Sequence, residues 1–394
     1  MIKTLFAERM DHIRASEIRE LLKITERPEV ISFAGGLPAP ELFPLRALAE
    51  LSSELILTEG ERALQYSTTE GFAPLREKIA SRMNKVFKTR VKPDEVLITS
   101  GSQQALDFIG KVLINKGDEI FLESPSYLGA INAFRAYEPK FVEVETDNDG
   151  MLPGALERAL EEASHPKFIY VVPDFQNPTG RTWSLERRKA LIKLAERYGV
   201  IVIEDNPYGE LRFEGEMLPS LKSMDTKGHV VYLGTFSKTL CPGMRIGWMA
   251  ACESLLEKFI LVKQGADLHT STISQMQINL FLERQDFDAH ISTIRQVYKK
   301  RRDVMLDAMS RYFLGRVPYN HPQGGLFNWA ELPEGMDAAM LLQKALKRDV
   351  AFVPGASFYP CEPRRNTMRL NFSNMPENRI EEGIKRLAEV IFNP

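Results

Sequence analysis

The chain contains few cysteines and no long apolar run. Its 394 residues include only three cysteines, Cys241, Cys252 and Cys361, and their spacing matches neither a disulfide framework nor a metal site. We therefore expect reduced thiols and a cytoplasmic protein. No apolar stretch reaches the roughly 18–20 residues of a membrane span, and the first twenty residues lack the apolar core of a secretory signal. We expect no membrane partner.

The sequence also lacks an excess of either charge and any paired histidines. The formal net charge is −2, from 51 basic and 53 acidic residues, so no overall field favours nucleic acid or an anionic membrane. The six histidines are scattered without HxH or HExxH spacing, and we expect no metal. What remains is ordinary globular composition, with 44% hydrophobic residues. A chain of this length is too long for one simple core and favours two lobes.

Short apolar runs alternate with amphipathic stretches between about Glu95 and Ala251. The runs are EVLIT, DEIFLE, KFVEVE, KFIYVVP, VIVIED, HVVYLG and IGWMAA, and the helical patterns between them include SQQALDFIGKVLI, YLGAINAFRAY and SLERRKALIKLAERY. This alternation predicts an α/β fold with a mostly parallel sheet and helices on both faces. Such sheets bind ligands beyond the carboxyl ends of their strands.

The two ends of the chain predict a smaller second lobe. Residues 286–313 form one long, densely charged helical pattern, followed by the strand-like runs GGLFNWAEL and NTMRLNFS and a final helix from about Glu377. At the start, the helix-like SEIRELLKIT precedes a Gly/Pro-rich loop, ISFAGGLPAPELFP. We expect a large domain over 46–300, and a small domain built from 1–45 and 301–394.

Four of the expected strand ends carry unusual polar residues. The first, TSGSQQ over 99–104, suits a phosphate, because small residues and a helix N-terminus let backbone N–H groups approach it. Taken alone, the pattern more commonly means a plain Gly-Ser turn that caps a helix, because Ser is a preferred N-cap. The second, VPDFQNPTG over 172–180, offers an amide, although a Pro/Gly turn with an Asx cap explains it in isolation.

The other two strand ends carry charge. In VIEDNPY over 202–208, two acids end an apolar strand and a tyrosine follows; a simple turn cap is the alternative. In GTFSKTLCPGMRIGW over 234–248, two hydroxyls precede Lys238 and Arg245 follows a Pro-Gly turn. A lysine after a buried strand is normally a solvated surface residue.

Together the four strand ends offer a phosphate cup, an amide, an acid with a tyrosine, and a lysine with an arginine. Pyridoxal phosphate needs this set of groups. The lysine amine can form an imine with the cofactor aldehyde, and the acid can keep the pyridine nitrogen protonated. An aromatic can stack on the ring, and Tyr127 in SPSYLGA is placed for this role.

The motifs SGSQQALD, PSY, FQNPTG, EDNPYGEL, GTFSKTLCPGMRIGW and MRLNFS, in this order, resemble class I/II aminotransferases of pyridoxal-phosphate fold type I. The resemblance covers essentially the whole chain. Within that class, SFAGGLPAPELFP, LQYSTTEG, KQGADLHTS and VAFVPGASFYP are similar to the 2-aminoadipate and kynurenine aminotransferase branch. The resemblance implies the aspartate-aminotransferase fold, a homodimer, and ping-pong transamination of an L-amino acid with a 2-oxo acid such as 2-oxoglutarate.

The resemblance also implies a role for each matching residue. Lys238 would hold the cofactor as a Schiff base and shuttle protons, Asp205 would pair with the pyridinium nitrogen, and Arg369 would clamp the substrate α-carboxylate. The remaining cofactor contacts would come from Ser102, Gln103, Tyr127, Asn177, Tyr208, Thr235, Ser237 and Arg245, with Tyr66 reaching the phosphate of the partner subunit. Substrate contacts would come from Asn177, Gly36 and, on the N-terminal helix that would cover the substrate, Arg19.

Several alternatives stay open at this point. Arg369 could be an ordinary strand surface residue, Tyr66 interface core, and Arg19 a solvated helix residue, while Cys241 looks like a spectator. A β-lyase or decarboxylase could use the same cofactor site, because fold does not fix reaction type. A transcriptional regulator with an aminotransferase-like domain would need an N-terminal DNA-binding module, and the SFAGGLP loop beginning near residue 32 leaves little room for one.

Overall fold

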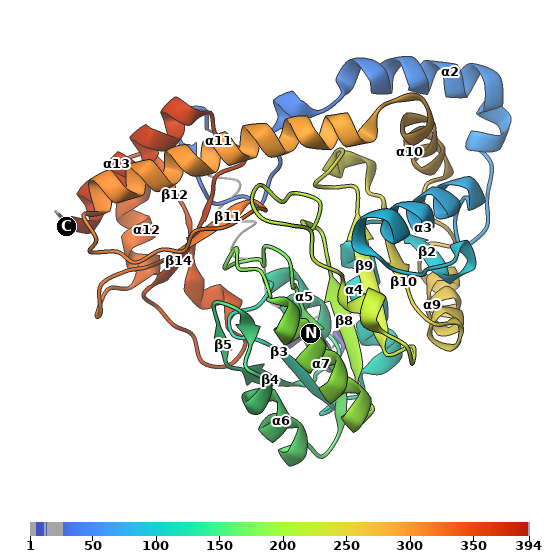
Figure 1. The fold of residues 1–394 in the computed structure, drawn as a ribbon, viewed down its shortest axis with the longest axis horizontal. Helices are drawn as coiled ribbons and strands as arrows, with labels where there is room; N and C mark the ends of the chain where they lie inside the picture. Colours follow the sequence, from blue (N-terminus) through green and yellow to red (C-terminus); the bar gives the residue numbers. More distant parts are fainter. Residues whose placement is uncertain (1–4, 12, 14–26, 393–394) are drawn as a thin grey trace.

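A seven-stranded sheet forms the centre of the molecule. The computed structural model describes residues 5–11, 13 and 27–392 (Figure 1). The strand order is β2-β10-β9-β8-β7-β3-β4, and only β10 runs antiparallel to its neighbours. The bounds are β2 Val96–Thr99, β3 Glu119–Glu123, β4 Lys140–Val144, β7 Pro166–Val171, β8 Ile201–Asp205, β9 Val230–Thr235 and β10 Gly247–Ala250. Each of the seven predicted apolar runs forms one of these strands.

Helices cover both faces of this sheet. Because side chains alternate along a strand, Ile120 and Leu122 of β3 share a core with the helices on one face, whereas Phe121 packs with those on the other. The first group is α4 (Ser102–Leu113), α5 (Leu128–Arg135) and α9 (Glu253–Ala266). The opposite face is covered by α6 (Pro153–Glu162), α7 (Leu185–Tyr198) and α8 (Leu221–Met224), and by α2 (Leu45–Ala63), α3 (Ala73–Phe87) and α10 (Thr272–Arg284).

The small lobe combines both ends of the described chain. Its antiparallel sheet has the order β11-β14-β13, and β1 pairs in parallel with β12, which attaches the segment after residue 27 to this lobe. The predicted C-terminal strands and final helix are therefore confirmed. The bounds are β1 Ile31–Ser32, β11 Phe327–Glu331, β12 Val350–Ala351, β13 Val353–Pro354, β14 Thr367–Asn371, α12 Ala338–Leu346 and α13 Glu377–Phe392.

One long helix joins the two lobes. Helix α11 (Phe287–Phe313) begins after Asp286, whose side chain accepts a hydrogen bond from the N–H of Ala289. It runs along the molecule from α10 to α13 (Figure 1). The boundary expected between residues 300 and 301 falls inside this continuous helix, and the division into domains stays a prediction. In the part of the chain that the structure describes, no helix combines the length and apolar composition needed to cross a membrane.

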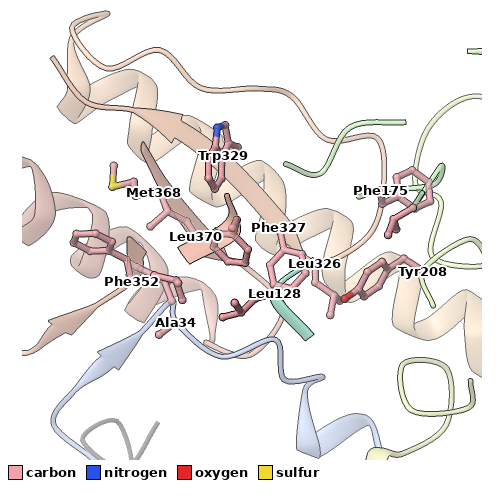
Figure 2. Close-up of a cluster of buried hydrophobic side chains, with 14 of the residues drawn as sticks. Ala34, Leu128, Phe175, Tyr208, Leu326, Phe327, Trp329, Phe352, Met368 and Leu370 are labelled. Atoms are coloured by element: carbon pink, nitrogen blue, oxygen red, sulfur yellow. The ribbon is translucent and has the colours of Figure 1, made fainter. Parts of the chain in front are cut away.

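A shared core packs the small lobe against the carboxyl ends of the large sheet. Figure 2 shows Tyr208, which follows β8, close to Leu326 and Phe327 at the start of β11. The rings of Tyr208 and Phe327 meet edge to face, with centroids 5.8 Å apart, a favoured arrangement for aromatic pairs. The junction of the lobes therefore lies where the sheet topology predicts a ligand site.

Candidate active site

A cavity of about 600 Å³ opens at this junction. Its walls come from the strand ends of the large sheet, from the loop after β1 and from β14 of the small lobe. Every described site residue expected from the sequence lines it, except Tyr66. These lining residues are Gly36, Ser102, Gln103, Tyr127, Asn177, Asp205, Tyr208, Thr235, Ser237, Lys238, Arg245 and Arg369.

The turn before α4 is shaped for an anion rather than for a side-chain cap. Gly101 occupies the N-cap position with φ 76°, and no side chain caps the helix. Ser102 is the first helical residue, so the alternative in which it caps the helix is wrong. A Cβ on Gly101 would lie 2.5 Å from Nη2 of Arg245, and one on Gly247 would lie 2.9 Å from the Ser102 nitrogen. Both glycines are needed for this close packing of the turn against Arg245 and β10.

Hydroxyls and a cation gather beside that turn. The Thr235 hydroxyl donates to Ser237 Oγ at 2.9 Å and accepts from the Ser237 N–H at 3.1 Å. Arg245 has a left-handed backbone with φ 55°, and its Nη2 donates to the Ser100 carbonyl at 3.3 Å. A guanidinium, two hydroxyls and the positive end of α4 form a donor set that fits a phosphate.

Asp205 presents one carboxylate oxygen without a partner. Its Oδ2 accepts from the Tyr170 hydroxyl at 2.7 Å, whereas Oδ1 is buried and has no hydrogen-bond partner among the described residues. Burial raises the pKa of Asp205 to about 6, against the opposing effect of the Tyr170 hydrogen bond. An orphaned buried acceptor is costly, and a cationic ring N–H would satisfy it. The residues present thus fit the pyridinium nitrogen of pyridoxal phosphate.

The other acid of the EDNPY motif, Glu204, has different partners. Glu204 accepts hydrogen bonds from the N–H groups of Leu221 and Lys222, at 2.9 and 2.8 Å. Adjacent strand residues point to opposite faces of a sheet. Glu204 therefore binds the start of α8 (Leu221–Met224) rather than the turn that directly follows β8, and the ligand interpretation suits Asp205.

Lys238 projects into the cavity near the loop after β1. Its Nζ donates to the Gly36 carbonyl at 2.8 Å. Burial, together with the charges of Arg369 and Arg245, lowers the pKa of Lys238 to about 8. A lowered pKa increases the fraction of neutral amine, which is the form that can attack a carbonyl or accept a proton.

Arg369 connects three parts of the chain. It is 2% exposed, which overturns the alternative of a surface residue on β14. Its Nη1 donates to Asn177 Oδ1 at 2.8 Å, and Nη2 donates to the Ala34 carbonyl at 2.6 Å. Its Nε is buried and has no hydrogen-bond partner within the described part of the chain. Burial lowers its pKa to about 10. Asn177 Nδ2 also approaches the Tyr208 hydroxyl at 3.5 Å.

The remaining lining residues hold the walls together. Tyr127 occupies the N-cap position of α5, and Gly129 leaves room for its ring, which a Cβ at that position would overlap. Gln103 Nε2 donates to the Gly129 carbonyl at 3.0 Å, which ties α4 to α5. Gly36 lies against Phe327, where a Cβ would be 3.2 Å from the ring.

One described residue of the expected set does not line the cavity. Tyr66 is 79% exposed and its ring packs edge-on against His269, with centroids 5.8 Å apart. Arg19 lies outside the described residues. Sequence reasoning missed Tyr170 and the Ala34 carbonyl. The pairing of Tyr170 with Ile203 across β7 and β8 places Tyr170 on the face that Asp205 also uses, and the sequence alone does not give this register.

Comparison with known proteins agrees with this geometry. The family model of aminotransferase class I and II matches residues 29–387. Aromatic-amino-acid aminotransferase 1 of Thermococcus litoralis is 48% identical over 98% of this chain and 94% of its own length. The 2-aminoadipate transaminase of Thermus thermophilus is 44% identical over 98% and 96%.

The crystal structure of Pyrococcus horikoshii kynurenine aminotransferase in complex with PMP has a TM-score of 0.95 and 44% identity. The match covers 100% of this chain and 98% of that one. These relatives favour transamination over the lyase alternative. The chain therefore belongs to the aminotransferase class I and II family, has the aspartate-aminotransferase fold and is an aminotransferase that uses pyridoxal phosphate.

Proposed function

We propose that this enzyme transfers the amino group of a broad set of L-amino acids to a 2-oxo acid such as 2-oxoglutarate. The donors would include 2-aminoadipate and aromatic or long aliphatic amino acids. The observation that carries the proposal is the convergence of Lys238, the free Oδ1 of Asp205 and Arg369 on one cavity. The names of the relatives, an aromatic-amino-acid aminotransferase and a 2-aminoadipate transaminase, support this range of donors.

Each part of the cofactor would be bound by a different group of residues. Bound pyridoxal phosphate supplies an electron sink for the charge that develops at the substrate α-carbon. Asp205 would keep the ring nitrogen protonated, and Asn177 with Tyr208 would bind the ring oxygen. Tyr127 would stack on the ring. The phosphate would be held by Ser102, Gln103, Thr235, Ser237 and Arg245.

Substrate binding and proton transfer would fall to three further groups. Arg369 would bind the α-carboxylate in place of the Ala34 carbonyl, with Asn177 alongside and Gly36 lining the substrate loop. Lys238 would first bind the cofactor and then carry the proton at the α-carbon. Its pKa of about 8 suits a group that must accept and return a proton near neutral pH.

Replacing Lys238 by alanine tests the assignment of this lysine. The wild-type holoenzyme should absorb in the visible through its lysine-bound cofactor, and Lys238→Ala should lose both this band and turnover. Lys299→Ala, on the exposed surface of α11, is a matched control and should keep both. An unchanged band with normal turnover in Lys238→Ala would show that another lysine holds the cofactor.

A panel of amino donors with 2-oxoglutarate tests the substrate range. We expect measurable kcat/KM for glutamate, 2-aminoadipate, phenylalanine and leucine, and activity with a single donor would refute the broad range. We further propose that Arg19 binds the distal carboxylate, so Arg19→Ala should weaken only the dicarboxylic substrates. Release of pyruvate and ammonia from cysteine conjugates without an acceptor would instead support the lyase alternative.

A homodimer with shared sites is the assembly we propose. Tyr66 is exposed, and so are Leu57 of α2, Leu64 at its C-cap and Leu268 beyond α9. Contiguous exposed apolar surface marks interaction sites, and we propose that these side chains contribute to one. Tyr66 would then reach the phosphate site of the partner subunit. Light scattering should give the mass of a dimer, and a fully active monomer would refute the idea. The cytoplasmic location and the domain division stay proposals as well.

A further inference from the structure

A fully buried lysine lies behind the phosphate-binding turn, outside the cavity. Lys263, on α9 in the KQGADLHTS motif, has 0% side-chain exposure. Its ammonium donates to both oxygens of Asp267, at 2.8 and 3.0 Å, to Gln104 Oε1 at 3.2 Å and to the Thr270 hydroxyl at 2.9 Å. An ammonium removed from water costs several kcal/mol unless it is paired and hydrogen-bonded. The Lys263 ammonium is both paired and hydrogen-bonded, and the Lys263–Asp267 pair therefore has a fixed geometry.

The network continues from this pair into the turn itself. Gln104 Nε2 donates to Asp267 Oδ2 at 2.7 Å, and Gln104 Oε1 accepts from the Ser100 N–H at 2.8 Å. The Ser100 hydroxyl donates to Asp267 Oδ2 at 3.1 Å. Both the backbone and the side chain of Ser100 are thus held from behind.

Ser100 in turn supports the groups that face the phosphate site. Its carbonyl accepts from Arg245 Nη2 at 3.3 Å, and it directly precedes Gly101, the N-cap of α4. A shift of Ser100 would move both the guanidinium and the N–H groups at the start of the helix. Because charge-assisted contacts depend on sub-ångström geometry, such a shift would weaken phosphate binding.

We propose that the Lys263–Asp267 pair, acting through Gln104 and Ser100, is a positioning unit for the cofactor phosphate. The inference rests on the proposed function, in which this turn and Arg245 hold that phosphate. Lys263 is a positioning residue, since it does not line the cavity. A purely structural role, packing α9 against α4, would affect stability without distinguishing ligands that carry a phosphate from those that do not.

Two variants separate these roles. Gln104→Leu removes the hydrogen bond from the Ser100 N–H and leaves in place both the ion pair and the hydrogen bond from the Ser100 hydroxyl to Asp267. The double variant Lys263→Met/Asp267→Asn removes the pair without leaving an unpaired buried charge. A matched control is Lys222→Met/Asp225→Asn. That pair is also largely buried, with its charged atoms 3.1 Å apart, but it lies next to the amino end of β9, whereas the phosphate site lies beyond the carboxyl ends of the strands.

The measurement is the dissociation constant of each apo-protein for pyridoxal 5′-phosphate and, separately, for pyridoxal, followed by absorbance. We expect the Kd for pyridoxal phosphate to rise at least tenfold in both test variants, and the Kd for pyridoxal to change less than threefold. The control should change less than threefold for both ligands. Circular dichroism should show folded apo-protein in every case.

Three outcomes would overturn the inference. Folded Gln104→Leu with wild-type affinity for pyridoxal phosphate would show that the Gln104 hydrogen bonds do not position the phosphate site. This result alone would overturn the inference, even if the double variant does not fold. Equal loss of both ligands would show a general structural role. Wild-type protein that binds pyridoxal phosphate and pyridoxal equally would refute the proposed phosphate site itself, and the inference with it. The other two outcomes would refute only the inference and leave the proposed function standing.

Discussion

Replacing Asp205 by asparagine should make the apo-enzyme more stable and the holoenzyme much less active. Asp205 is 2% exposed, and among the described residues only one of its carboxylate oxygens has a hydrogen-bond partner, the Tyr170 hydroxyl. Asparagine keeps an oxygen for Tyr170 and removes the charge. The substitution therefore isolates the cost of burying a charge that has no counterion until a cationic ligand arrives.

The size of the effect follows from the pKa of the group. Burial raises the pKa of Asp205 from 3.8 to about 6, which corresponds to up to about 3 kcal/mol of lost stability once the carboxyl is ionised. Between these two values the unfolded chain binds fewer protons than the folded chain, so stability falls as the pH rises through this window. Apo Asp205→Asn should therefore gain most at pH 8, and the gain should shrink as the pH approaches 5.

Activity should change in the opposite direction. A charge-assisted hydrogen bond to the ring nitrogen is worth roughly 1.5–3 kcal/mol, which is roughly ten- to two-hundredfold in kcat/KM. Urea unfolding of the apo-proteins between pH 5 and 8, with kcat/KM of the holoenzymes, measures both effects. Two results would refute the reasoning: an apo-variant whose stability difference does not depend on pH, or a holoenzyme within about threefold of wild type, under ~1 kcal/mol.

Three further predictions concern other parts of the site. Arg369→Lys should raise the KM for the amino acid more than tenfold, with a smaller change in kcat. A lysine cannot replace a guanidinium that binds a carboxylate bidentately and also bonds Asn177, and an unchanged KM would contradict this. The pKa of Lys238 is about 8, so the initial rate at which apo-protein binds pyridoxal phosphate should rise with pH and level off above about 8. A rate that continues to rise towards pH 10.5 would contradict the lowered pKa of a buried lysine. Mixing inactive Lys238→Ala and Tyr66→Phe chains should change activity through mixed dimers, and strictly additive activity would argue against shared sites.

Much of the fold could be predicted because the large sheet is buried on both faces. Continuous apolar runs such as KFIYVVP and HVVYLG are characteristic of such strands, and every one of them was found. The carboxyl-end rule then identified the neighbourhood of Lys238, Asp205 and Asn177. The same rule does not say which of two adjacent acids faces the ligand; that depends on strand alternation and register, which separate Glu204 from Asp205.

Other features could not be predicted, because they depend on side chains that are far apart in the sequence. The contact between Ser100 and Asp267 joins residues on different elements, and nothing in either motif indicates the partner. The absence of a side-chain cap on α4 is a related case. Serine is a favoured N-cap, but here Gly101 takes that position because the close approach of Arg245 leaves no room for a Cβ.

The hydrogen bonds of Arg369 and Lys238 would favour substrates that carry an α-carboxylate. Arg369 and Lys238 both donate to backbone carbonyls of one short segment, at Ala34 and Gly36. That segment is fixed to the small lobe, since the Phe33 N–H donates to the Ala351 carbonyl at 2.8 Å and the Phe33 carbonyl accepts from Asn371. A carbonyl satisfies a cation's hydrogen bonds but leaves its charge uncompensated, which is why burial lowers the pKa of Arg369 to about 10.

A carboxylate is the stronger partner for a guanidinium, because it supplies both the acceptor and the opposite charge. Exchange of the Ala34 carbonyl for a substrate carboxylate would therefore offset the cost of burying a cation that has no carboxylate partner among the described residues. An amine without a carboxylate cannot make this exchange. It would leave Arg369 bonded to the Ala34 carbonyl, with the cost of burying the cation unchanged. Selectivity would thus come from the charge on Arg369, which the fold keeps buried until an anionic substrate neutralises it.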